Sequence, residues 1–178
     1  MSHLFSTLTL RSVTLRNRIA MSPMCMYSAA DDGLATDWHL AHYVSHATGG
    51  VGLIITEATA VHVHGRISAN DLGLWQDAQI DPLARIVRLC QAQGAVMCTQ
   101  LAHAGRKAWS AHKGTGAATP VAPSALPFDA DWVTPHALTL AEIDEVVLAF
   151  RAAAQRAIAV GFDAIEVHSA HGYLSHSF

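Results

Sequence analysis

Four short apolar segments separated by helical stretches are the feature that most limits the fold of this chain. The segments are RIAMSPM, VGLIITEA, GAVMCTQLAH and FDAIEVHSA, and they begin at residues 18, 51, 94 and 162. Each one ends in small or polar residues, which is typical of strands that are buried on both faces of a sheet. With helices between them, the segments predict the order β-α-β-α-β-α-β.

The first elements are predicted from alternation and from helix-end signals. The stretch LTLRSVTLRNR alternates apolar and polar residues on either side of Arg11 and Ser12, which predicts a short hairpin before the first strand. A first helix is expected over about 36–48, where two glycines follow. A second helix is expected to begin at Asp81, with Pro82 in the favoured first turn.

The third helix has the clearest signals at both ends. Thr139 and Glu142 form a T-x-x-E capping box, apolar residues then recur at helical spacing, and Gly161 stands where a C-terminal cap belongs. Strands joined by such helices imply a parallel sheet with right-handed crossovers, which is either doubly wound or closed into a barrel.

The positions of the polar residues favour the barrel. GTGAAT at residue 114 lacks a third glycine, and no GxxxxGK occurs, so a dinucleotide or P-loop site is weakly supported. In a barrel the C-terminal strand ends converge on one catalytic face. Polar or reactive residues follow all four strands: Ser22 to Cys25, Glu57, Gln100 with His103, and His168 with His171.

The length of the chain fits only part of such a barrel. A complete (β/α)8 barrel takes about 250 residues, whereas this chain has 178 and ends just after its fourth strand. We therefore expect residues 1–178 to form one incomplete domain, half of a TIM barrel, with a hairpin and about four βα units. Unpaired edge strands and exposed apolar faces would follow, and two copies could close on each other as a homo-oligomer.

Composition excludes several classes of protein. With 51% hydrophobic and 14% charged residues, the chain can build a sizeable core, and its net charge of -3 without a basic cluster disfavours nucleic acid. No apolar stretch approaches the roughly 18 residues of a membrane span, and no secretory leader is recognised. Three cysteines without a CxxC pair suit a reducing cytoplasm better than a disulfide framework.

The stretch EVHSAHGYL carries the strongest candidates for chemistry. Residues three apart in a strand face opposite sides, so His168 and His171 can share a site only if the chain leaves strand geometry before Gly172. Two imidazole N–H groups would then polarise a substrate oxygen, and Tyr173 could deliver a proton. The residues alone leave two alternatives open. The two histidines could be structural residues whose hydrogen bonds are satisfied at a strand end, or they could bind a metal together with His103.

Other candidates have equally plain structural explanations. MSPMCMYS could be a platform for a flat aromatic ligand, or a methionine-rich strand with Cys25 as an inert buried thiol. His39, His42 and His46 recur along the first helix and are interpreted mainly as packing and solvent contacts. The cations of QLAHAGRK could reach a ligand or remain solvated in a loop.

Taken together, RNRIAMSPMCMYS, HLAHY, GLIITEATAV, GRI, QLAHAGRK and GFDAIEVHSAHGYL resemble the Old Yellow Enzyme family of FMN-dependent NAD(P)H oxidoreductases. The motifs follow in the same order over some 150 residues. The cysteine in SPMCMY makes the chain resemble, within the family, the bacterial branch related to YqjM and the xenobiotic reductases. The resemblance implies a TIM barrel that holds FMN at its C-terminal face, uses NADPH or NADH, and reduces activated alkenes. It also implies that residues 1–178 are the N-terminal half of that barrel.

The resemblance also implies a role for each candidate residue and no metal. His168 and His171 would bind the carbonyl or nitro oxygen of the substrate, and Tyr173 would protonate its α-carbon. Tyr27 would close one side of the substrate pocket. The residues expected to contact the flavin are Ser22, Pro23, Met24, Cys25, Ala58 and Gln100.

Two departures from the family keep other functions open. The segment SAHKGTGAATPVAPSALPFDADW differs from the family except around APSALPF, which leaves the substrate open, and the family's phosphate-binding loops belong to later strands. The alternatives are a non-catalytic half-barrel that needs its missing half and a metal-dependent barrel hydrolase using His103, His168 and His171.

Overall fold

A computed structural model describes residues 3–108 and 120–178, and its centre is a four-stranded parallel sheet. The strand order is β3-β4-β5-β8, so each crossover leads to the neighbouring strand, as in a barrel that is built up in sequence. A separate antiparallel hairpin, β1 and β2, precedes the sheet. The strands of these two sheets are β1 (Leu8–Leu10), β2 (Val13–Leu15), β3 (Ala20–Met21), β4 (Leu53–Ala60), β5 (Val96–Ala102) and β8 (Ala164–Val167).

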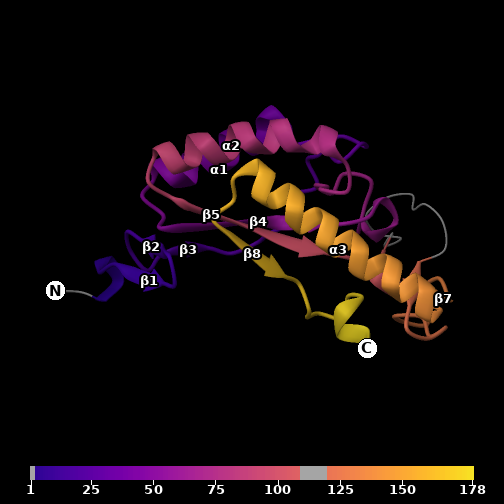
Figure 1. The fold of residues 1–178 in the computed structure, drawn as a ribbon. Helices are drawn as coiled ribbons and strands as arrows, with labels where there is room; N and C mark the ends of the chain where they lie inside the picture. The colour runs from indigo at the N-terminus through magenta and orange to yellow at the C-terminus, as the bar shows by residue number, and fades with distance from the viewer. Residues whose placement is uncertain (1–2, 109–119) are drawn as a thin grey trace.

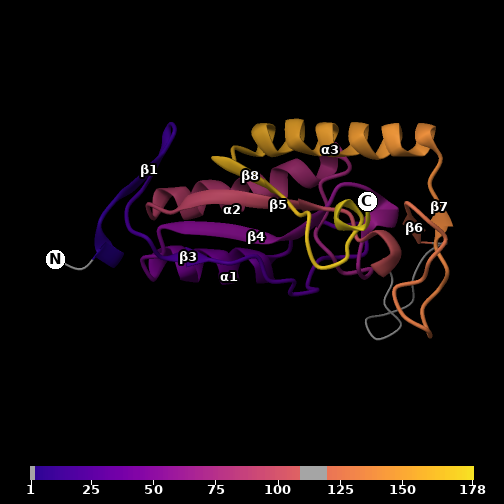
Figure 2. The same cartoon turned by 90° about the horizontal axis from the view of Figure 1, so that it is seen from below.

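Three α-helices pack against one side of the sheet. They are α1 (Asp37–Thr48), α2 (Ile80–Ala92) and α3 (Leu140–Val160). Helices α1 and α2 lie together over one face, and α3 runs beside α2 toward β8 (Figure 1). Seen from below, the opposite face of the sheet carries no α-helix among the described residues (Figure 2). The predicted half-barrel, with helices outside and an inner face, is therefore confirmed.

Short elements complete the described chain. A second pair of strands, β6 (Val121–Ala122) and β7 (His136–Ala137), lies in a segment for which no strand is expected from sequence. None of the helices in the described ranges is long and apolar enough to cross a membrane. The 3-10 turns are η1 (His3–Phe5), η2 (Val63–Gly65), η3 (Asp77–Gln79), η4 (Gly105–Lys107) and η5 (Ser175–Ser177).

The hydrophobic core lies between the helices and the sheet. Apolar residues of the strands meet apolar faces of all three helices there, and their burial is the main favourable term in folding. The fully buried members include Ile54, Met97 and Leu101 from the strands, Tyr43 and Ala47 from α1, Leu83 and Cys90 from α2, and Ala153 and Ala157 from α3.

The helix-end signals agree with the structure. The Thr139 backbone N–H donates to the Glu142 carboxylate at 2.7 Å, and the Glu142 N–H donates to the Thr139 hydroxyl at 3.3 Å. Gly161 ends α3 with φ at 95°, the left-handed conformation that favours glycine. Helix α2 begins at Ile80, one residue before the predicted Asp81.

Three expectations about the strands were wrong. Strand β3 has only two residues, and Pro23 follows it without an N–H to donate to a sheet. Strand β8 is not buried on both faces, because it is the last strand of the described sheet and its Ile165 and Val167 are 37% and 56% exposed. Glu57 does not end a strand, since β4 continues to Ala60 past an irregularity in its pairing.

Candidate active site

The turn after β8 brings three of the predicted site residues together. The strand ends at Val167, and His171 and Gly172 then adopt φ values of 56° and 74°, which turn the chain back. The His168 ring lies 5.2 Å from the His171 ring and 5.0 Å from the Tyr173 ring, measured between centroids. The departure from strand geometry that a shared site requires is therefore present.

His168 is held as a neutral hydrogen-bond donor. Its side chain is buried, and its Nδ1 accepts a hydrogen bond from the Ala170 N–H at 3.3 Å. This bond assigns the proton of the neutral ring to Nε2. Burial, followed by the neighbouring His171, lowers the pKa of His168 below its ordinary value of 6.5. At neutral pH the ring therefore has one N–H to offer a ligand.

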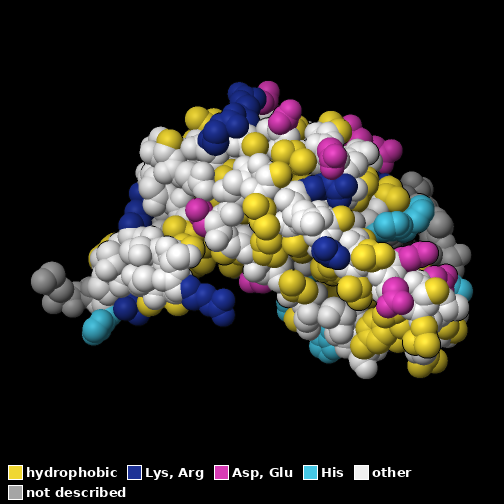
Figure 3. Space-filling model, viewed as in Figure 1, with side chains coloured by type: hydrophobic (Ala, Val, Ile, Leu, Met, Phe, Trp, Pro, Cys, Tyr) yellow, Lys and Arg dark blue, Asp and Glu magenta, His cyan; other side chains and the backbone are white. Residues whose placement is uncertain are grey.

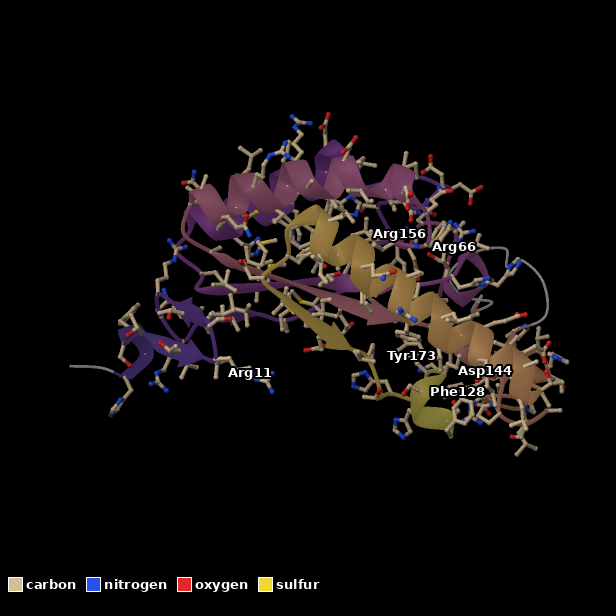
Figure 4. All side chains as sticks on the ribbon, in the orientation of Figure 1. Arg11, Arg66, Phe128, Asp144, Arg156 and Tyr173 are labelled. Atoms are coloured by element: carbon tan, nitrogen blue, oxygen red, sulfur yellow. The ribbon has the colours of Figure 1, made fainter. Side chains whose placement is uncertain are left out.

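Tyr173 is held as a protonated phenol and is contacted by a cation. Burial, followed by the nearby Cys25 and Tyr27, raises the pKa of Tyr173 to about 12. The Lys107 Nζ lies 4.7 Å from the centre of the Tyr173 ring and donates to the His171 carbonyl at 3.0 Å. Lys107 also lies 4.4 Å from the Phe128 ring, and Figure 4 shows Phe128 and Tyr173 at the same end of the sheet. Lys107 is therefore part of the site wall.

The segment after β3 reaches the same place. Cys25, Tyr27 and Tyr173 are partly buried against a small cluster formed by Ile67, Ala104 and Ala108. Burial, followed by Cys25, raises the pKa of Tyr27 to about 12. The preceding residues are more open, with Ser22 and Met24 exposed and Pro23 half-buried.

Ala58 and Gln100 lie on the inner face of the sheet. They are paired across β4 and β5, and Leu101, the residue after Gln100, points into the helix-side core, so Gln100 points the other way. The Gln100 Nε2 donates to Glu166 Oε1 at 2.5 Å, which fixes the plane of the amide. Ala58 lines a small hollow beneath Tyr173 together with Ala60, Ala102 and Ala104.

The chemistry of these residues suits contact with a flavin ring. Small alanine side chains lie on the inner face beside the Gln100 amide, which offers a polar contact. Ser22 to Met24 and the half-buried Cys25 add backbone groups and a sulfur after the end of β3. The hollow that the alanines line has a volume of only about 10 Å³, so a ring would have to lie over this face and not inside the hollow.

His103 does not join the His168 pair. It stacks on His62 with a centroid distance of 6.3 Å, and both line a separate cavity with His64 and Val146. The His103 Nδ1 accepts from the Gly105 N–H at 3.0 Å, and burial lowers its pKa to about 3. Within residues 3–108 and 120–178, no three His, Cys, Asp or Glu side chains are grouped to hold a metal ion. The position of His103 in a separate cavity thus contradicts the three-histidine metal site that the hydrolase alternative requires.

Sequence reasoning missed a buried polar cluster beneath the site. His39 is fully buried and contacts Glu57, so the expected packing is confirmed for this histidine and the expected solvent contact was wrong. Helical spacing in HLAHY shows that His39 and Tyr43 share a face. It does not reveal the carboxylate on β4 that this face meets.

The chain matches known flavin enzymes over nearly its whole length. The model of the NADH:flavin oxidoreductase / NADH oxidase family matches residues 3–178. The NADPH dehydrogenase of Listeria monocytogenes serotype 4a is 56% identical over 100% of this chain and 51% of its own length. The NADPH dehydrogenase of Clostridium acetobutylicum is 48% identical over 98% of this chain and 50% of its own length.

Solved structures agree with the sequence relatives. Morphinone reductase has a TM-score of 0.86 at 33% identity and covers 96% of this chain with 49% of its own. Old Yellow Enzyme from Pichia sp. AKU4542 has a TM-score of 0.88 at 31% identity, with 97% of this chain and 47% of that one covered. The chain spans about half the length of these relatives, and the fold is the N-terminal half of their barrel. It belongs to the NADH:flavin oxidoreductase / NADH oxidase family.

Proposed function

We propose that this chain carries the catalytic residues of an FMN-dependent NAD(P)H oxidoreductase that reduces the C=C bond of α,β-unsaturated carbonyl or nitro compounds. The observation that carries the proposal is the grouping of His168, His171 and Tyr173 beside an inner face of small side chains. The family implies FMN as the cofactor, and the names of the relatives support NADPH as the reductant. NADH remains the alternative reductant.

The histidine pair would activate the substrate. The Nε2–H of His168 and an N–H of His171 would donate to the carbonyl or nitro oxygen, where negative charge develops as the β-carbon is reduced. Since His168 is buried, its hydrogen bond would act in a site of low dielectric. The chemistry that FMN would supply when bound is hydride transfer between the nicotinamide and that β-carbon.

Tyr173 would complete the reduction. A phenol whose pKa is about 12 keeps its proton at neutral pH and can give it to the α-carbon as the C=C bond is saturated. Tyr27 would close one side of the substrate pocket. Ser22, Pro23, Met24 and Cys25 would line the flavin, with Ala58 and Gln100 against its ring system.

A second candidate is a half-barrel that does not catalyse by itself. Exposed apolar side chains on β8 and α3 favour it, because a catalytic domain normally covers such surface. Its partner would be the rest of a barrel or a second copy of this chain. The odd cysteine count supports a reducing cytoplasm for either candidate.

The test is retention of flavin. The purified chain is mixed with FMN, freed of excess, and its absorbance is measured. A retained band near 450 nm, roughly where bound FMN absorbs, followed by NADPH-dependent reduction of an enone, is the expected result. The same assay is run on a completed barrel, made by joining this chain to the remainder of the Listeria relative. Flavin retained only by the completed barrel favours the second candidate, and no retention by either contradicts the proposal.

A further inference from the structure

Glu57 is a buried carboxylate to which the proposed reaction assigns no role. Its side chain is 1% exposed, and it lies in β4 where the pairing with β5 shifts. Thr56 pairs with Thr99 and Ala58 with Gln100, so Glu57 is the extra residue of a β-bulge. Bulges redirect a side chain and are frequent next to active sites.

Two residues of α1 lie against one oxygen of this carboxylate. The Tyr43 hydroxyl donates to Glu57 Oε1 at 3.2 Å and accepts from the Glu57 backbone N–H at 3.0 Å. The bulge frees this N–H from the strand ladder, and Tyr43 satisfies it. The Nε2 of His39 lies 3.3 Å from the same carboxylate oxygen, although the ring is not directed for a hydrogen bond.

His39 is itself held by a hydrogen bond from the residue that precedes α1. Its Nδ1 accepts the Thr36 N–H at 3.0 Å, which assigns the proton of the neutral ring to Nε2, on the side of Glu57. Both His39 and Tyr43 are at most 1% exposed. The cluster is therefore shielded from bulk solvent, and each of its polar contacts is stronger than it would be in water.

The second carboxylate oxygen holds the segment that enters the site. Glu57 Oε2 accepts the backbone N–H of Met26 at 3.0 Å. Met26 belongs to no strand or helix, so the carboxylate supplies the partner that a sheet would otherwise give. The next residue, Tyr27, has φ at 52°, an unfavourable conformation for a bulky side chain that persists only when its surroundings hold it.

We propose that Glu57 is a positioning residue: it ties the segment from Cys25 to Tyr27 to α1 and β4, and so sets where the Cys25 thiol and the Tyr27 ring lie. The inference rests on the proposed function, because the segment matters to catalysis only if it lines the flavin. A carboxylate suits this task, since both Met26 N–H and Tyr43 O–H are donors and a carboxylate has only acceptors. An amide at position 57 would direct a donor at one of them.

The test is the rate at which iodoacetamide alkylates Cys25 in the 178-residue chain without flavin, followed by mass spectrometry. Cys90 and Cys98 are internal references, because they are buried and burial raises the pKa of each to about 11. Glu57→Gln is expected to speed Cys25 alkylation several-fold relative to these references. Tyr43→Phe keeps the carboxylate and its bond to Met26 but removes the hydrogen bond to α1, so it is expected to speed alkylation less than Glu57→Gln does.

Asp163→Asn is the control. Asp163 is also a carboxylate that accepts a backbone N–H, from Met97 at 2.8 Å, but it lies beside the start of β5, away from the segment that contains Cys25. It is expected to leave the Cys25 rate close to wild type. Equal acceleration in Asp163→Asn and Glu57→Gln, or none in Glu57→Gln, would overturn the inference.

A measurement on the unaltered chain covers the case in which Glu57→Gln does not fold. Hydrogen exchange followed by NMR should show the Met26 amide protected, although it lies outside every strand and helix. Exchange at the rate of an exposed amide would contradict the inference. Neither experiment uses FMN, so failure to retain flavin counts against the proposed function alone, and unchanged alkylation counts against Glu57 alone.

Discussion

At the scale of single residues, His168 and Tyr173 are held in the protonation states that their proposed roles require. Burial lowers the pKa of His168 and raises that of Tyr173 to about 12, so each keeps a hydrogen to donate at neutral pH. The same cause acts in opposite directions because burial disfavours the charged form of either group. Burial in the same site thus keeps a hydrogen on both donors.

Replacing His168 tests the role of polarising donor. His168→Ala in the completed barrel should lower the rate of alkene reduction by about 10² to 10³, the usual effect of removing one such donor. Flavin retention should change little, because the histidine would contact substrate oxygen. Stopped-flow oxidation of the reduced enzyme by an enone measures the rate. His176→Ala, at an exposed histidine on η5, is the control, and an equal loss of rate and flavin in His168→Ala would refute the role.

Replacing Tyr173 separates the two half-reactions. Tyr173→Phe keeps the ring that packs near Cys25 and Tyr27 but removes the proton. The rate of alkene reduction should fall by about 10² to 10⁴, as for other general acids. Reduction of the flavin by NADPH should stay nearly the same, since that step needs no proton from the phenol. If flavin reduction slows as much as alkene reduction, Tyr173 is not the proton donor.

At the scale of elements, the N-terminus of α3 depends on its capping box. Hydrogen bonds from Thr139, followed by that from His136, lower the pKa of Glu142 to about 2. A carboxyl whose folded pKa is depressed stabilises the fold above its unfolded value of 4.5 and loses that contribution as the pH falls toward 2. Thr139→Ala removes the two hydrogen bonds of the Thr139 hydroxyl to Glu142, so it should lower the free energy of unfolding at pH 7 and lower it less near pH 2. Urea unfolding at both pH values measures this, with exposed Thr134→Ala as the control; a cost that does not depend on pH would contradict the coupling.

The elements that sequence predicts well are those with local signals. Thr139, Glu142 and Gly161 define α3 because capping and left-handed glycine act within one or two turns. The bulge at Glu57 could not be predicted in this way. It depends on Tyr43, fourteen residues earlier and on another element, and no periodicity in the sequence encodes that pairing.

At the scale of the whole molecule, the same distinction applies to the site. His168, His171 and Tyr173 are close in sequence, and Gly172 signals the turn that gathers them, so their grouping could be predicted. The place of Lys107 on the Tyr173 ring could not, because it requires the relative positions of β5 and β8. Sequence also misjudged the burial of β8, since burial depends on what covers a strand and not only on its own residues.

An apolar groove of about 370 Å³ runs between α3, β8 and the C-terminal residues. Val147, Val167 and Phe178 line it and are 56 to 67% exposed. Figure 3 shows hydrophobic side chains along the face of the molecule that carries α3.

Because this groove is apolar and exposed, the chain should bind the dye anilinonaphthalene sulfonate. Val147→Lys should reduce the fluorescence of the dye by placing a charge in the groove. Leu148→Lys is the matched control, because Leu148 is similarly exposed on α3 but lies outside the groove. The completed barrel should bind little dye if its added half covers this face. Equal dye binding by the chain and the completed barrel would show that the groove is not the surface against which a barrel closes.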